Sequence, residues 1–148
     1  MPLARLFSMA FRLLIDGLHD RLKAQGWDDV RPAFGFVLLA CRDQPTSSKE
    51  VSVLMGITKQ AASKLIDTME DLGYVTRSAS AADGRAKEVE LSDRGRKLLG
   101  VVERSYTALE EEWAGVIGAR SVDRIRADLL KVLLHANNGT LPPVRPTW

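Results

Sequence analysis

The chain has 148 residues, of which 45% are hydrophobic and 27% charged, and its formal net charge is +2. This length and composition are typical of one globular domain or of a domain with extensions. No run of about eighteen apolar residues occurs, which excludes a membrane-spanning helix. The single cysteine, Cys41, excludes an intrachain disulfide and fits the reducing cytosol, so we expect a cytoplasmic protein.

The first two predicted helices are rich in apolar residues. Over residues 3–24, apolar side chains recur at spacings of three and four, which is the period of one helix face. They are Leu3, Leu6, Phe7, Ala10, Phe11, Leu14, Leu18 and Leu22. A second helix is expected to begin near Pro32 and to stop at Gln44-Pro45. It is apolar nearly all round, which indicates burial on most sides.

Two short helices joined by a tight turn are predicted next, at about 48–55 and 59–72. Ser47 and Glu50 form a capping-box signature for the first, and Thr58 can cap the second. The second helix has its expected buried stripe at Leu65, Met69 and Leu72. Two helices joined by about three residues that include a glycine have the helix-turn-helix layout.

A hairpin and two more helices complete the predicted elements. Strands are expected at 74–79 and 86–91, joined by a turn with an Asp-Gly signal. A long amphipathic helix follows from Ser92 to about Gly118, and another begins at Ser121. The apolar stripes of the first and last helices are longer than a small winged core can cover, which favours a homodimer over packing within one chain.

The predicted fold class is mainly α with a small β-hairpin: a winged helix-turn-helix flanked by N- and C-terminal dimerisation helices. We expect four parts along the chain. They are an N-terminal dimerisation helix (1–30), a DNA-binding winged helix-turn-helix (31–92), C-terminal dimerisation helices (93–137) and an extended, proline-containing tail (138–148).

Four motifs resemble the multiple-antibiotic-resistance regulator (MarR) family of bacterial transcription factors. They are Gly-Ile-Thr-Lys-Gln-Ala-Ala-Ser-Lys-Leu-Ile at 56–66, Leu-Gly-Tyr-Val at 72–75, Asp-Gly-Arg-Ala-Lys at 83–87 and Leu-Ser-Asp-Arg-Gly-Arg at 91–96. The resemblance covers roughly residues 3–137. It implies a triangular homodimer whose recognition helices enter successive major grooves while the wings reach minor grooves. It also implies repression of nearby genes, often relieved by a small ligand or by thiol oxidation.

The polar face of the second short helix and the hairpin carry the candidate DNA contacts. We assign Gln60 and Lys64 to base edges, because glutamine pairs with adenine and lysine donates to guanine. Phosphate or mixed contacts are expected from Thr58, Lys59 and Ser63. Arg85 is expected to enter a minor groove, where narrow grooves attract arginine. The operator should be pseudo-palindromic, with half-sites about one helical turn apart.

Other readings of these residues remain open. Arg77 and Lys87 fit phosphate contacts and strand-surface charges equally well, and Arg94 and Arg96 fit a structural or a phosphate role. Arg85 can also be an exposed charge beside a good turn. The resemblance implies that Asp83 orients Arg85 and braces the wing. The polar helix face itself can be a merely solvated surface.

Two alternative functions compete with DNA binding. Residues 46–92 carry six basic and seven acidic side chains, which favours a winged helix that binds a protein partner and no DNA. A thiol-based redox sensor would need an accessible, low-pKa Cys41, whereas a cysteine in an apolar helix is usually inert core. His19 and His135 are isolated, so we expect no metal, and without a nucleophile or nucleotide motif we expect neither a cofactor nor an enzyme.

A small-molecule effector is a further expectation. The resemblance implies effector binding between the dimerisation and DNA-binding regions. The aromatic residues predicted there are Trp27, Phe34, Phe36, Tyr106 and Trp113. Aromatic residues at helical spacing are also common in a plain core, so both readings stand.

Overall fold

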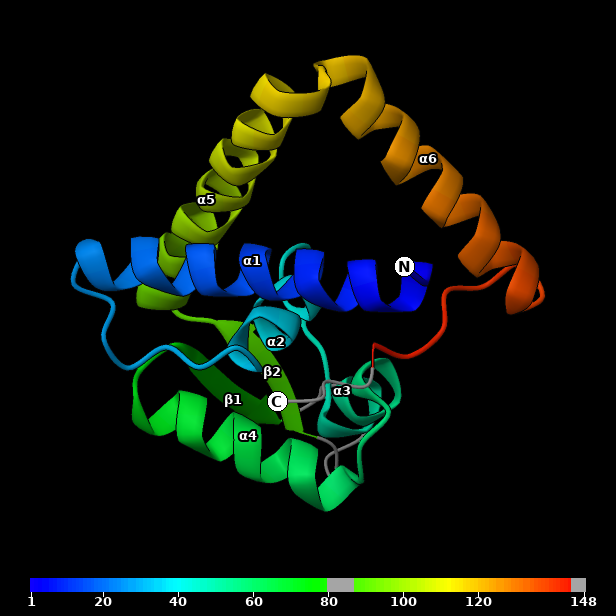
Figure 1. The fold of residues 1–148 in the computed structure, drawn as a ribbon. Coiled ribbons are helices and arrows are strands. Elements are labelled where there is room, and N and C mark those ends of the chain that lie inside the picture. The colour runs from blue at the N-terminus through cyan, green and yellow to red at the C-terminus, as the bar shows by residue number, and fades with distance from the viewer. Residues whose placement is uncertain (80–86, 145–148) are drawn as a thin grey trace. The chain divides into compact units, whose positions relative to one another are not determined.

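The computed structural model describes residues 1–79 and 87–144. Its described part contains six helices and one antiparallel pair of strands, which confirms the predicted fold class (Figure 1). In chain order the elements are α1 (Leu3–Ala24), α2 (Phe34–Ala40), α3 (Ser48–Met55), α4 (Lys59–Asp71), β1 (Val75–Ala79), β2 (Lys87–Leu91), α5 (Asp93–Ile117) and α6 (Ala119–Ala136). No helix in these residues combines the length and apolarity needed to cross a bilayer.

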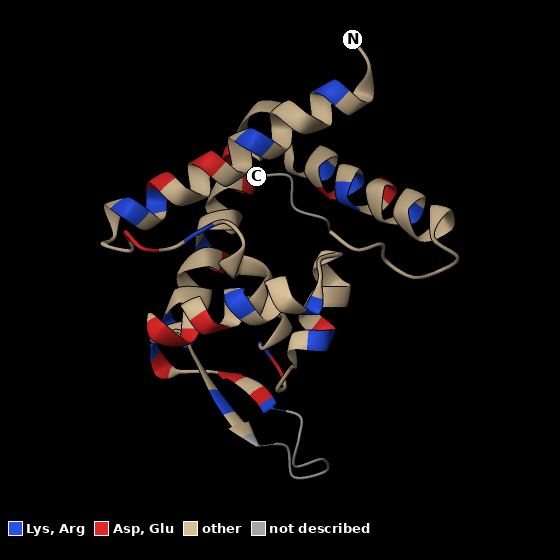
Figure 2. Cartoon of the chain, turned by 90° about the horizontal axis from the view of Figure 1, so that it is seen from below, with Lys and Arg blue, Asp and Glu red and all other residues tan. Residues whose placement is uncertain are grey.

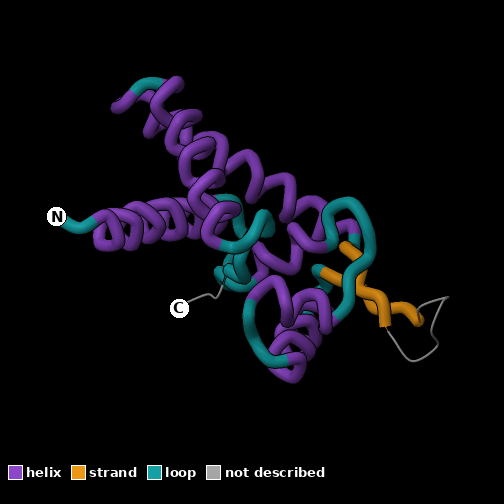
Figure 3. Tube along the Cα trace, turned by 90° about the vertical axis from the view of Figure 1, so that its right-hand side faces the viewer, coloured by secondary structure: helices purple, strands orange, loops and turns teal. Residues whose placement is uncertain are grey.

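The chain divides into two compact units. One contains Met1–Val30 and Val102–Pro142, and the other contains Arg31–Val101 together with Pro143–Trp148. Helix α5 contributes its first turns to the second unit and the rest of its length to the first. Figure 3 distinguishes the helices from the two strands.

The helix-turn-helix forms in the second unit because its ends are capped as the sequence predicts. Ser47 accepts a hydrogen bond from the backbone N–H of Glu50, and the Glu50 carboxylate accepts one from Ser47, so the capping box is complete. Gly56 ends α3 at φ 64°, a left-handed conformation that glycine adopts without strain. The Thr58 Oγ1 then accepts from the N–H of Ala61 and starts α4.

The core of this unit lies between α2, α3, α4 and the hairpin. Its fully buried side chains are Phe34, Val37, Leu38, Val51, Ala62, Ile66, Met69, Tyr74, Val89 and Leu98. The hairpin register pairs Val75 with Leu91 and Arg77 with Val89. Thr46 adds a short antiparallel bridge, since its N–H donates to the Val89 carbonyl and its carbonyl accepts from the Val89 N–H. No local pattern in the sequence indicated this bridge.

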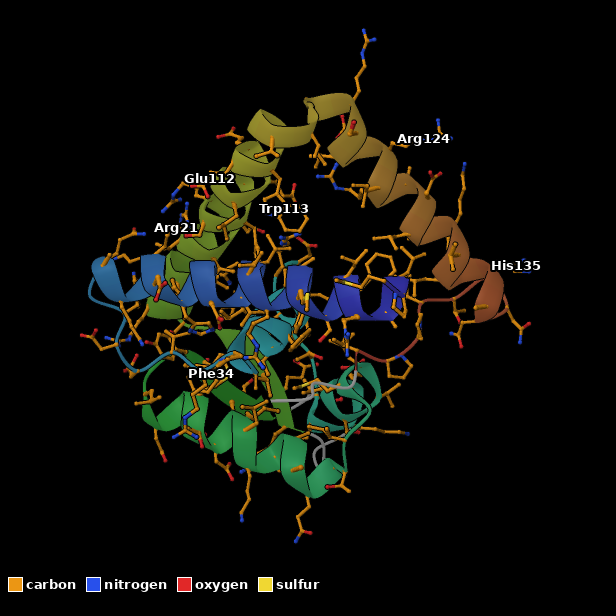
Figure 4. All side chains as sticks on the ribbon, in the orientation of Figure 1. Arg21, Phe34, Glu112, Trp113, Arg124 and His135 are labelled. Atoms are coloured by element: carbon orange, nitrogen blue, oxygen red, sulfur yellow. The ribbon has the colours of Figure 1, made fainter. Side chains whose placement is uncertain are left out.

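The first unit packs α1 against α5. Gly17 allows the close approach, because a Cβ at that position would lie 2.7 Å from Cδ2 of Leu109. The Arg21 guanidinium on α1 pairs with the Glu112 carboxylate on α5 (Figure 4). The second half of α1 buries Ile15, Leu18 and Leu22, whereas α6 has no buried residue at all.

Several expected boundaries need correction. Helix α2 is shorter than predicted, Phe34–Ala40, because residues 41–44 turn before the proline at 45. Helix α6 begins two residues earlier than Ser121, at Ala119 after Gly118. The buried stripe of α4 is Ala62, Ile66 and Met69, while Leu65 and Leu72 are only half-buried. The helix is therefore rotated by part of a turn from the predicted orientation.

Candidate nucleic-acid interface

Helix α4 has one buried face and one polar, exposed face. With Ala62, Ile66 and Met69 fully buried, the side chains of Lys59, Gln60, Lys64 and Asp67 are left exposed, and Ser63 is half-buried. Thr58 is exposed at the N-cap. The predicted contact residues of the helix therefore share one accessible side, at the end where a recognition helix meets bases.

A groove of about 450 Å³ lies beside this face. It is lined by Ser47, Ser48, Lys49, Lys59, Ser63, Asp67, Arg77 and Lys87. Four of these eight residues are cations and one is an acid; Ser47 precedes α3, and the others lie on α3, α4, β1 and β2. Figure 2 colours the Lys and Arg positions along the chain blue and the Asp and Glu positions red. Within the described part of the chain, no ion pair engages Lys49, Lys59, Lys64 or Lys87. All four lysines are exposed.

Lys49 is a groove residue that the sequence analysis missed. It stands in the first turn of α3, where the helix dipole disfavours a cation, so local helix stability does not explain its placement. The unusual position of this lysine can be seen in the sequence, but no sequence pattern indicates that the first turn of α3 lies next to the hairpin. The groove unites the N-terminal turns of both short helices with β1 and β2.

Arg77 does not extend toward solvent. Its side chain is 15% exposed, and its Nη1 pairs with Asp67 and lies 3.4 Å from the Glu70 carboxylate. Its Nη2 donates to the Ser63 carbonyl at 3.2 Å. The guanidinium thus joins β1 to Ser63, Asp67 and Glu70, which lie along one side of α4.

The wing tip is only partly described. Arg85 and Asp83, the predicted minor-groove arginine and its brace, lie outside the described residues. Lys87 opens β2 and is exposed, opposite Ala79 in the register.

Arg94 contacts Tyr74, which supports the structural interpretation of this residue. Its guanidinium carbon lies 4.7 Å from the centre of the Tyr74 ring, and its Nη2 donates to the Tyr74 hydroxyl at 3.1 Å. Arg96 is exposed and lines a small polar hollow of about 140 Å³ that also includes Cys41 and Glu90.

Cys41 is a buried thiol that donates to the Val89 carbonyl at 3.5 Å. Burial, with the Glu50 and Glu90 carboxylates adding to it, raises the pKa of Cys41 to about 11. The thiol is therefore protonated at neutral pH and only 4% of the residue is exposed. A reactive thiol needs the opposite setting, so these observations disfavour the redox-sensor alternative. In the described chain, no group of three His, Cys, Asp or Glu side chains is placed to hold a metal ion.

The five aromatic residues proposed for an effector differ in their surroundings. Phe34 is fully buried in the second unit and packs against Tyr74, with ring centres 5.9 Å apart. Phe36, Trp27 and Tyr106 are half-buried, and burial raises the pKa of the Tyr106 hydroxyl. Trp113 lines a groove of the first unit with residues of α1 and α6 (Figure 4).

A family model described as MarR family matches residues 35–86, from α2 to the wing. The winged helix-turn-helix of this chain is therefore similar to that of the MarR family. The chain is 24% identical over 104 residues to the transcriptional repressor MprA of Escherichia coli K12, which is 70% of this chain and 59% of MprA. It is 31% identical over 96 residues to ExpG of Rhizobium meliloti, a transcriptional activator of exopolysaccharide II synthesis, which is 65% of this chain and 50% of ExpG. The chain thus spans between half and three-fifths of the length of these relatives.

Solved structures share the same fold. The transcriptional repressor CouR bound to a 23-mer DNA duplex matches with a TM-score of 0.75 at 20% identity, over 88% of this chain and 92% of CouR. CouR from Rhodococcus jostii RHA1 bound to p-coumaroyl-CoA matches with a TM-score of 0.70 at 21% identity, over 88% of this chain and 90% of that one.

Proposed function

We propose that this protein is a sequence-specific DNA-binding transcriptional regulator that acts as a homodimer on a pseudo-palindromic operator. The observation that carries the proposal is the two-sided character of α4. One face is fixed in the core through Ala62, Ile66 and Met69, and the other presents uncommitted cations beside a basic groove. A protein with the same fold, CouR, is bound to a DNA duplex, which supports DNA binding by this fold.

The assignment of contacts follows the geometry of α4. Gln60 and Lys64 are the base-reading residues, with adenine and guanine as their partners. Lys59, Ser63 and Lys87 bind phosphate, and Lys49 joins them because it lines the same groove. The Thr58 oxygen is occupied as an acceptor by Ala61, which leaves its hydroxyl hydrogen to donate to a phosphate. The resemblance to the family adds Arg85 in the minor groove with Asp83 as its brace.

A second copy of the chain would cover the apolar faces of the first unit. Leu3, Phe7 and Phe11 on α1 are 67%, 46% and 43% exposed. Together with Ile125 and Leu129 of α6 they line an almost wholly apolar groove of about 730 Å³. Patches of this kind mark interaction sites. We therefore assign residues 1–30 and 93–137 to dimerisation and 31–92 to DNA binding.

Repression relieved by a small molecule is the finer part of the proposal. MprA and CouR are repressors, whereas ExpG is an activator. These relatives therefore do not determine whether this protein represses or activates transcription. The ligand in the CouR structure, p-coumaroyl-CoA, supports an aromatic acid or its thioester as effector class. An effector would weaken DNA binding only through its preference for the non-binding conformation.

Selection of duplexes from a random-sequence pool by the full chain tests the proposal. We expect enrichment of an inverted repeat whose half-sites are about one helical turn apart. We also expect the binding constant to fall steeply with salt, because neutralised phosphates release counterions. No enrichment, or an affinity indifferent to salt, would favour the rival protein-interaction module.

A further inference from the structure

Arg77 on β1 and the acidic residues of α4 form a bridge between the wing and the recognition helix. We infer that Arg77 is a positioning residue of the reading surface. It fixes α4 against β1 and screens Asp67 and Glu70, and it does not itself contact phosphate. This inference rests on the proposed DNA-binding function and explains why carboxylates occur on a helix face that should meet a polyanion.

The geometry of the bridge matches the donors of a guanidinium group. Ser63, Asp67 and Glu70 are spaced by four and then three residues, so they form one line along α4. The Asp67 carboxylate, the Glu70 carboxylate at 3.4 Å and the Ser63 carbonyl at 3.2 Å all accept from Arg77. A guanidinium has five N–H donors in a fixed plane and is suited to several acceptors at once.

The environment of Arg77 separates it from the lysines nearby. Its side chain is 15% exposed, against 57% for Asp67 and 41% for Glu70. Lys59, Lys64 and Lys87 are exposed and have no ion pair among the described residues. To reach a phosphate, Arg77 would have to release its acceptors on α4, and two carboxylates would then face the DNA without a counter-charge.

The expected role is therefore electrostatic as well as mechanical. With Arg77 in place, the group of Arg77, Asp67 and Glu70 carries one net negative charge, and without it the group carries two. Like charges facing each other across an interface oppose binding, and they act over about 10 Å at 0.1 M salt. Removal of Arg77 should weaken DNA binding by exposing this repulsion.

A double-mutant cycle on a labelled random-sequence duplex distinguishes screening from direct contact. In the wild-type background, Arg77→Gln should lower the affinity about tenfold, whereas with Asp67→Asn and Glu70→Gln present it should lower it by less than about threefold. In the background of Asp67→Asn and Glu70→Gln, where no repulsion remains, Arg77→Gln should leave the slope of log affinity against log salt unchanged. Lys59→Ala is the matched control for a true phosphate contact and should reduce that slope by about 0.9.

Three other outcomes have distinct meanings. An equal loss in both backgrounds, with the slope reduced by about 0.9, would make Arg77 a phosphate ligand and overturn the inference alone. A wild-type protein without salt-dependent DNA binding would overturn the proposed function as well. If Arg77→Gln does not fold, Arg77→Met replaces it in the cycle. This variant also removes the positive charge, so affinity should fall in the wild-type background only, while undiminished affinity would contradict the inference.

Discussion

Gly95 in the first turn of α5 offers a sharp test of how the DNA-binding unit is assembled. A Cβ at this position would lie 2.0 Å from the carbonyl oxygen of Tyr74 and 3.1 Å from its carbonyl carbon. The same oxygen accepts from the Ser92 N–H at 3.1 Å, and the Gly95 N–H donates to the Ser92 Oγ at 3.0 Å. Helix α5 is therefore held directly against the segment that follows α4.

The close contact predicts that Gly95→Ala destabilises the protein, whereas helix propensity alone predicts that it stabilises the protein. Alanine in a helix interior is normally worth about 1 kcal/mol over glycine. Here the new methyl group must move the Tyr74 backbone by about 1 Å, and overpacking of this kind costs roughly 1–3 kcal/mol or somewhat more. Loss of the hydrogen bond from Ser92 to Tyr74 adds about 1 kcal/mol. We expect a net destabilisation of about 1–3 kcal/mol.

Urea unfolding followed by circular dichroism measures this difference at fixed protein concentration. Gly115→Ala in the same helix is the matched control, because a Cβ there meets nothing within 4 Å. It should stabilise the protein by about 0.5–1 kcal/mol. If Gly95→Ala were as stable as the wild type or more so, the close packing of α5 on Tyr74 would be wrong.

Four further predictions concern Cys41, the apolar groove of the first unit and Trp113. The Cys41 thiol should react slowly with a disulfide reagent at pH 7 and rapidly in urea; fast reaction of the native protein would restore the redox-sensor alternative. In the folded protein the pKa of Cys41 is raised from 9.0 to about 11. The buried thiol therefore stabilises the fold below pH 9, and this stabilisation is lost as the pH rises toward 11. In Cys41→Ala, this loss should be absent from a plot of unfolding free energy against pH. Phe7→Glu should convert the dimer to a monomer in light scattering, whereas Met9→Glu, about 200° further round α1, should not; equal behaviour of the two would place the interface elsewhere. Aromatic acids and their CoA thioesters should be screened for release of labelled DNA from the protein. Those that release it should change the tryptophan fluorescence of the wild type more than that of Trp113→Phe, and an equal change in both proteins would remove Trp113 from the proposed effector site.

Local signals predicted most of the winged helix-turn-helix. The Ser47–Glu50 capping box, Gly56 and Thr58 each act within a few residues, so the ends of α3 and α4 could be read directly from the chain. The alternation of Val89 and Leu91 likewise predicted β2. Periodicity was less reliable for α4, because Ile66 and Leu65 are adjacent apolar residues and only packing decides which one faces the core.

Contacts between distant segments could not be predicted in this way. The Thr46 bridge to Val89 and the bridge from Arg77 to Asp67 depend on which residues the fold brings together. The excess of acidic over basic side chains in residues 46–92 therefore favoured a protein partner, although two of those carboxylates, Asp67 and Glu70, pair with Arg77, ten and seven residues away. Lys49 was missed for the same reason, since only the folded groove places it beside Lys59 and Lys87.

The central claim is that the exposed side of α4 reads base edges, and repeating the duplex selection with Gln60→Ala tests it most directly. The wild type and this variant should enrich the same inverted repeat, but the variant should lose its preference at one position in each half-site, worth about 1–3 kcal/mol of discrimination. Identical base preferences for the two proteins at every position would contradict the account.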